Sequence, residues 1–220
     1  MLLSLIFSLL AAQEPTLLTT KNYCTLAGEV NSESMQELKF CLIDQDLTRG
    51  KKTYPIYLVV DSGGGEIYSG LRFIEFAKTI KNLETVTIFA ASMAAGIVEA
   101  LPGKRHATEN AIFMFHRAKG SFRGQFEDGE VEQQLAMWKQ VVRKMEQMNA
   151  DRIGISLAVY KNKVINEWWI YGKDSVKQKV SDKMSDFECS NVLLQERRTV
   201  SIETFFGPVE FEESACPLVN

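Results

Sequence analysis

Histidine is scarce in this sequence, and cysteine occurs without the spacing that metal sites need. There are two histidines and four cysteines, and no CxxC pair among them. Because a zinc site needs three or four such ligands together, we expect no metal and no cofactor. No GxxxxGK[ST] phosphate loop is present, so the chain does not hydrolyse ATP through that motif. The formal net charge of −3 gives no basic excess, and nucleic acid is not expected as a partner.

Apolar segments long enough to span a bilayer are also missing at the start of the chain. The first twelve residues read MLLSLIFSLLAA, which is shorter than a membrane-spanning helix requires. We interpret residues 1–12 as a signal peptide cleaved after Ala11 or Ala12, although no lysine or arginine precedes the apolar run. The alternative is an N-terminal extension that is disordered or packs on a partner. The mature protein is therefore expected to be periplasmic or secreted and free of the membrane, with the cytoplasm as the alternative.

The cysteines bear on the same question of compartment. An even number of cysteines in an exported chain favours disulfides, and four allow three connectivities. The most local arrangement pairs Cys24 with Cys41 and Cys189 with Cys216. Buried free thiols in a reducing compartment are the alternative. At 220 residues and 45% hydrophobic content, the chain is long enough for one domain with a sizeable core.

A change from strand-like to helix-like sequence marks the centre of the chain. Residues 85–90 (TVTIFA) are a β-branched and aromatic run, and residues 91–96 (ASMAAG) are small and favour a helix. Ser92 lies at this junction, where the following amides are unpaired at a helix N-terminus. Such a position suits a nucleophile whose oxyanion needs donors. The alternative for Ser92 is a plain N-cap.

Two further segments make the nucleophile interpretation the better one. The apolar run of residues 56–60 leads into residues 61–65 (DSGGG), whose amides can form a concavity for an anion, or simply a turn. The apolar run of residues 111–115 ends in His116, which can act as a general base for Ser92. Taken alone, His116 would be a polar residue at the edge of a core.

Together these segments resemble the Clp-type serine peptidases, the ClpP family. The resemblance covers residues 26–182, and the matching segments follow the family's order. They are LAGEV (26–30), YLVVDSGGGEIYSG (57–70), AASMAAG (90–96), FMFHRAKG (113–120) and INEWWIYGKDSVKQKVSD (165–182). The resemblance implies an α/β fold of the ClpP/crotonase type, with stacked ββα repeats and a mostly parallel sheet. Alternating strand and helix patterns in the sequence agree with that class.

The resemblance also implies roles for particular residues. Ser92 would be the nucleophile and His116 the general base, with the backbone N–H groups of Gly64 and Met93 as oxyanion donors. The third catalytic member departs from the pattern, because alignment puts Glu167 where the family usually has aspartate. A glutamate can orient an imidazole, but its extra methylene changes the reach.

Three other positions complete the comparison with the family's site. Asn166 is the neighbouring candidate for the third catalytic member, and Asp174 is less favoured because it falls in the next helix-like stretch. Gly63 replaces the family's usual proline, which loosens the glycine loop without removing a donor.

Helical patterns are predicted over residues 32–47, 66–82, 126–150 and 157–164. The third would be about 40 Å long and corresponds to the family's protruding handle helix, through which two heptameric rings stack. Packing within its own subunit is the alternative. Residues 120–125 resemble the handle's glycine-containing strand, which lines the substrate cleft in relatives. We expect a peptidase domain over residues 13–187 and an extension over residues 188–220, with a β-hairpin near residues 199–211.

The predicted function is a serine endopeptidase that cleaves peptides or unfolded chains inside a homo-oligomeric ring of stacked subunits. An ATPase unfoldase would have to be a separate chain, and outside the cytoplasm it would lack ATP. Three alternatives remain. A catalytically inactive ring subunit is suggested by Glu167. A relative of signal peptide peptidases would use a Ser/Lys dyad instead of His116. A crotonase-like acyl-CoA enzyme would share the glycine-rich oxyanion loop without needing Ser92.

Overall fold

The computed structural model describes residues 14–121, 127–205 and 207–219. The predicted signal peptide and most of the 120–125 segment lie outside these residues. The centre of the fold is a six-stranded sheet made of β2 (Tyr23–Val30), β3 (Ile56–Gly65), β4 (Leu83–Ala91), β5 (Arg105–Phe115), β6 (Trp168–Tyr171) and β7 (Lys183–Met184). Strands β2 to β5 are parallel neighbours, β6 runs antiparallel to β5, and β7 pairs with the start of β5. The prediction of an α/β fold with a mostly parallel sheet is confirmed.

The helical segments are α1 (Ser32–Arg49), α2 (Ile67–Ala77), α3 (Met93–Ala100), α4 (Glu130–Ile153), α5 (Leu157–Lys163), the 3-10 turn η1 (Val164–Asn166), α6 (Asp174–Lys177) and α7 (Asn191–Gln195). Helices α1, α2 and α3 connect the parallel strands β2 to β5 in succession, whereas α4, α5 and η1 lie between β5 and β6. Asn31 begins α1 with a capping box, because its side chain accepts from the amide of Ser34 and the Ser34 hydroxyl accepts from the amide of Asn31. Helix α2 ends earlier than the pattern predicts, where the Thr79 hydroxyl binds the Phe76 carbonyl.

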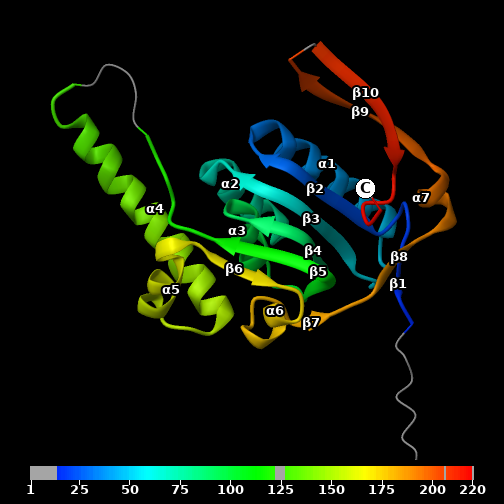
Figure 1. The fold of residues 1–220 in the computed structure, drawn as a ribbon, viewed down its shortest axis with the longest axis horizontal. Coiled ribbons are helices and arrows are strands. Elements are labelled where there is room, and N and C mark those ends of the chain that lie inside the picture. The colour runs from blue at the N-terminus through cyan, green and yellow to red at the C-terminus, as the bar shows by residue number, and fades with distance from the viewer. Residues whose placement is uncertain (1–13, 122–126, 206, 220) are drawn as a thin grey trace, which may run out of the picture.

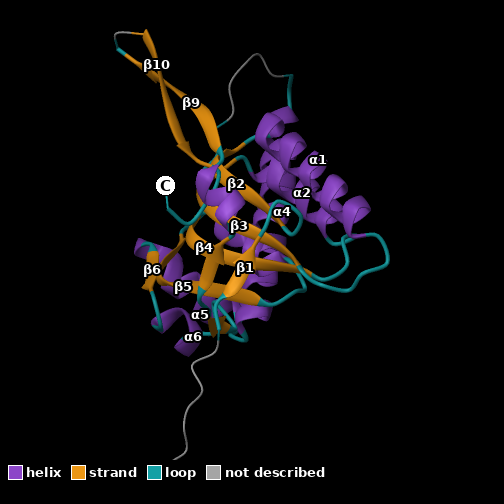
Figure 2. Ribbon diagram, turned by 90° about the vertical axis from the view of Figure 1, so that its right-hand side faces the viewer, coloured by secondary structure: helices purple, strands orange, loops and turns teal. Residues whose placement is uncertain are grey.

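Both faces of the sheet are covered, which explains why β3 is apolar without alternation. Ile56, Leu58 and Val60 belong to the main core under helices α1 to α3. Tyr57 and Val59 point to the opposite face and join a second, smaller cluster. Figures 1 and 2 show the helices and the C-terminal segments on different sides of the strands.

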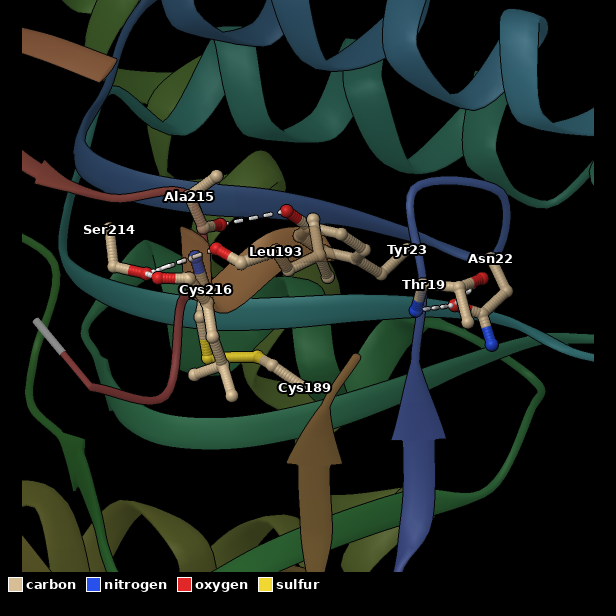
Figure 3. The surroundings of a disulfide bond; sticks show 9 residues. Thr19, Asn22, Tyr23, Cys189, Leu193, Ser214, Ala215 and Cys216 are labelled. Carbon is tan, nitrogen blue, oxygen red and sulfur yellow. Dashed lines mark hydrogen bonds between the residues drawn. A yellow bond between two sulfur atoms is a disulfide. The ribbon is translucent and has the colours of Figure 1, made fainter. Parts of the chain in front are cut away.

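The second face is covered by both ends of the described chain. Strands β1 (Thr16–Leu18) and β8 (Phe187–Cys189) form a parallel pair, and α7 follows directly. A disulfide joins Cys189 to Cys216 beneath this layer, and the Tyr23 hydroxyl donates to the Ala215 carbonyl at 2.9 Å (Figure 3). A second disulfide joins Cys24 on β2 to Cys41 on α1. The more local of the predicted pairings is thus the one formed.

Two elements project from the body in Figure 1. One is the antiparallel hairpin of β9 (Arg197–Thr204) and β10 (Gly207–Ser214), in the predicted place. The other is α4, which buries only Asn149, Ala150 and Ile153 near its C-terminal end. It begins four residues later than predicted, because Gly129 has a φ of 82° and ends any helix on its N-terminal side. Within the described ranges, no helix is long and apolar enough to cross a bilayer.

A buried ion-pair network anchors the end of α3 to the sheet. Arg105, at the start of β5, is 4% exposed and lies between Glu99 on α3 and Asp182. Its Nη2 is 2.7 Å from Asp182 Oδ1. Burial raises the pKa of Glu99 to about 8 although Arg105 opposes the shift, and the Glu99 Oε1 atom has no partner among the described residues. Arg105 therefore stabilises the buried Glu99 side chain, and removing it is expected to destabilise the folded protein.

We expect Arg105→Met to lower the free energy of unfolding by about 3 to 5 kcal/mol at pH 8, because the buried Glu99 carboxyl group loses its cationic partner. The loss should be smaller at pH 5. A carboxyl group whose folded pKa lies above its unfolded value gives stability at low pH that is lost as pH rises. Urea denaturation at both pH values measures this. The double variant Glu99→Gln, Arg105→Met is the control, and an equal loss in both variants would contradict the explanation.

Candidate active site

The parallel strands bring three distant segments to one edge of the sheet. Strands β3, β4 and β5 are neighbours that run in the same direction, so their carboxyl ends meet. Gly64 lies at the end of β3, Ser92 directly after β4 and His116 directly after β5. The backbone N–H of Ser92 donates to the Met114 carbonyl at 2.8 Å, which fixes the serine beside β5.

Ser92 adopts a backbone conformation that is rare for a side-chain-bearing residue. Its φ is 55° and its ψ is −119°, at the abrupt turn from β4 into α3. Such strain persists only where the surrounding structure enforces it and is typical of functional sites. The Ser92 side chain makes no capping hydrogen bond to α3. The alternative of a plain N-cap therefore does not describe this serine.

The Ser92 hydroxyl is instead paired with His116. Nε2 of His116 lies 2.7 Å from Oγ of Ser92, within the range of a nucleophile–base hydrogen bond. The other histidine, His106, is buried elsewhere, and its ring nitrogens contact Glu84 at 2.7 Å and Ser185 at 2.8 Å. The structure thus separates the two histidines into one that faces a serine at the sheet edge and one held in the core.

Gly64 and the amide of Met93 lie side by side. A Cβ atom on Gly64 would come within 2.7 Å of the Met93 nitrogen and 2.8 Å of the Ser92 Cβ, and the φ of Gly64 is 91°. Only glycine permits this approach. As the first residue of α3, Met93 has an N–H without a helical acceptor. The backbones of Gly64, Ser92 and Met93 therefore lie close together, and amides in such a position can stabilise an oxyanion.

The Gly64 donor is already engaged in this structure. Its N–H donates to Oγ of Ser62 at 3.1 Å, and the Ser62 hydroxyl in turn donates to the Gly28 carbonyl. A substrate oxyanion would have to compete with this neutral acceptor. A serine followed by three glycines does not by itself predict this contact, because the contact depends on the fold of the loop.

Glu167 does not bind His116. The antiparallel pairing of β5 with β6 ends at Phe115 and Trp168, so His116 and Glu167 each lie one residue beyond the last paired position. The Glu167 carboxylate instead accepts from Nε1 of Trp169 at 2.9 Å. The structure thus joins Ser92 to His116 but leaves Glu167 turned away.

The two other candidates for the third catalytic member, Asn166 and Asp174, are placed no better to bind His116. Asn166 is exposed at the end of η1. Asp174 pairs with Lys177 at 2.7 Å on α6. Within the described ranges, no hydrogen bond joins either of them to His116.

A cavity of about 40 Å³ adjoins the Ser92–His116 pair. Its walls come from α2, α3, the end of β5, α4 and α5. Ile67, Met93, Ala118, Phe115, Val142 and Met145 supply apolar surface, and Glu146, Asn149 and Tyr160 supply polar atoms. The sequence analysis did not single out the last three. One signal for a polar residue at this cavity was present in the sequence: Asn149 lies on the α4 face that also carries Val142 and Met145.

Residues 13–186 match the family model of the Clp proteases. That match covers most of the chain. The chain belongs to the Clp protease family.

Family membership places the geometry described above in a peptidase fold. The match ends at residue 186, immediately before β8, so the layer that carries Cys189, α7 and the hairpin lies beyond the Clp protease region. In the part of this Clp-type chain that the structure describes, no three His, Cys, Asp or Glu side chains are grouped to hold a metal ion. The groups that lie at its sheet edge are a hydroxyl, an imidazole and two backbone amides.

Proposed function

We propose that this chain is a serine endopeptidase that cleaves peptides or unfolded protein chains. Ser92 Oγ attacks the scissile carbonyl while His116 Nε2 takes its proton. The N–H groups of Gly64 and Met93 bind the oxyanion, and His116 then protonates the leaving amine. Water, activated by the same imidazole, hydrolyses the acyl-enzyme and returns the proton to Ser92.

The observation that carries this proposal is the 2.7 Å contact between Ser92 Oγ and His116 Nε2. The strained backbone at Ser92 and the adjacent amides support it, because both would be unnecessary in an inert loop. A Ser/Lys dyad has less support, since no lysine lines the cavity beside Ser92. A crotonase-like enzyme would need the amides but would not need the hydroxyl and imidazole in contact.

We expect Ser92→Ala to lower peptide cleavage by about a thousand-fold or more, because the nucleophile is lost. A fluorogenic peptide assay measures this, and a fluorophosphonate probe should label the wild type but not the variant. Ser201→Ala on the exposed hairpin is the matched control and should retain activity and labelling. Equal turnover in the wild type and Ser92→Ala would remove the enzyme proposal for this site and favour the inactive ring subunit.

Glu167 is proposed to orient His116 after turning away from Trp169. Phe115 pairs with Trp168, so Glu167 and His116 are each one residue away from a paired position. We infer that rotation of the exposed Glu167 side chain brings its carboxylate to His116 Nδ1. The positive φ of 66° at Glu167 shows that the chain is constrained here.

We expect Glu167→Gln to lower kcat/KM by about ten-fold to a hundred-fold, because an amide stabilises the imidazolium less than a carboxylate does. Glu188→Gln, an exposed glutamate on β8, is the control. Unchanged kinetics in Glu167→Gln would mean that Ser92 and His116 act as a dyad.

A homo-oligomeric ring is proposed as the working assembly. Helix α4 extends from the body and exposes Val131, Leu135 and Met137 at 37 to 50% of their surface. Exposed apolar side chains along one projecting helix are typical of a subunit interface. We expect a concentration-dependent oligomer in analytical ultracentrifugation that Leu135→Arg weakens. A monomer at all concentrations would contradict this.

Export from the cytoplasm is proposed from the apolar run of residues 1–12 and from the two disulfides. Disulfides persist mainly in oxidising compartments. Mass spectrometry of the protein from its native host should show a mature chain that begins after Ala11 or Ala12. A mature chain that still begins with Met1 would contradict the proposal of a cleaved signal peptide.

A further inference from the structure

The cavity beside Ser92 has mostly apolar walls with buried polar residues among them. Ser92 and His116 border it, so it can receive a substrate side chain next to the cleaved bond. Met93, Phe115 and Met145 form part of its walls, and Asn149 and Tyr160 also line it.

Asn149 carries an unmatched hydrogen-bonding atom. The residue is 5% exposed, and its Oδ1 has no partner in the described part of the chain. Its Nδ2 donates to the Tyr160 hydroxyl at 2.9 Å. A buried acceptor without a partner is destabilising, so it is retained only where something offsets that cost. Turning the amide over leaves Nδ2 as the unmatched group, and the pair remains incomplete.

Tyr160 contributes a second unused group. It is 3% exposed, and burial raises its pKa to about 12, so the phenol keeps its proton. No hydrogen bond among the described residues uses that proton, since the hydroxyl accepts from Asn149 Nδ2. Rings of Phe115 and Trp168 pack edge-on against Tyr160 and hold it in place. The pair therefore offers one acceptor and one donor from a fixed position.

We propose that Asn149 and Tyr160 select an uncharged substrate side chain with a hydrogen-bonding end, such as asparagine or threonine, immediately before the cleaved bond. This specificity rests on the peptidase function proposed above. An amide or hydroxyl can donate to Asn149 Oδ1 and accept from the Tyr160 phenol. An apolar side chain of the same shape would leave both groups unmatched.

Size and charge at the pocket agree with a short neutral side chain. A volume of about 40 Å³ holds roughly three water molecules, which matches the three or four heavy atoms of threonine or asparagine. Glu146 also lines the cavity, but its carboxylate is paired with Lys161 at 3.3 Å. Because the charge of Glu146 is already compensated, we do not expect the pocket to prefer a basic side chain.

Matched peptides test the proposal on the full-length protein. The substrates differ at one position and form the isosteric pairs asparagine/leucine and threonine/valine, with a lysine peptide added; mass spectrometry confirms the cleaved bond. We expect the wild type to favour the polar member of each pair by about ten-fold or more in kcat/KM. Asn149→Leu, which keeps the shape of the side chain, should reverse the asparagine/leucine preference, and Tyr160→Phe should reduce it.

The outcomes separate this inference from the proposed function. A preference of the wild type for leucine, valine or lysine, or a preference unchanged by Asn149→Leu, would overturn the specificity. A fluorophosphonate probe, which carries no substrate side chain, reports on Ser92 independently. If it labels Ser92 while the polar preference is missing, only the specificity is wrong. If neither labelling nor cleavage occurs, the peptidase function fails and the specificity with it. Thermal denaturation of each variant identifies loss of folding.

Discussion

The backbone turn at Ser92 is the constraint on which the site depends. With a φ of 55°, the chain passes from β4 into α3 without an intervening loop, and the serine hydroxyl projects at the sheet edge instead of capping the helix. A residue with a side chain tolerates this conformation only under compensation from its neighbours. Gly64 supplies part of it, because any side chain there would collide with Ser92 and Met93. The same close approach brings the Gly64 backbone next to Ser92 and the Met93 amide.

The sheet behind this turn is buried on both faces. Helices α1 to α3 cover one face, and β1, β8 and α7 cover the other. The disulfide between Cys189 and Cys216 closes the second layer, of which β8 and α7 lie beyond the part that matches the Clp proteases. On the first face, the buried Arg105 ties the far end of α3 to the sheet. Helix α3 is thus held at both ends, by the turn at Ser92 and by the ion pair at Glu99.

Several polar groups at the sheet edge are satisfied within the free protein by contacts that a substrate would replace. The Gly64 amide binds Ser62, and the Glu167 carboxylate binds Trp169. Each of these contacts is with a neighbour two residues away in sequence, so exchanging it requires only local rotation. The Asn149–Tyr160 pair differs, because it remains incomplete in the free protein. The proposed chemistry at Ser92 and the proposed selection of a polar side chain therefore depend on different groups of the free protein.

The sequence by itself determined the alternating strands and helices, the position of Ser92 after a strand and that of His116 after the next one. These follow from local composition, since β-branched runs, small-residue segments and glycines report on the backbone near them. Helix ends were less well predicted, because Gly129 and the Thr79 hydroxyl act on single turns. Only the tertiary structure decided that Ser92 contacts His116, that Glu167 turns to Trp169 and that Asn149 lies beside the nucleophile. Those contacts join residues from separate elements or depend on one side-chain torsion, and neither is encoded in the pattern of neighbouring residues.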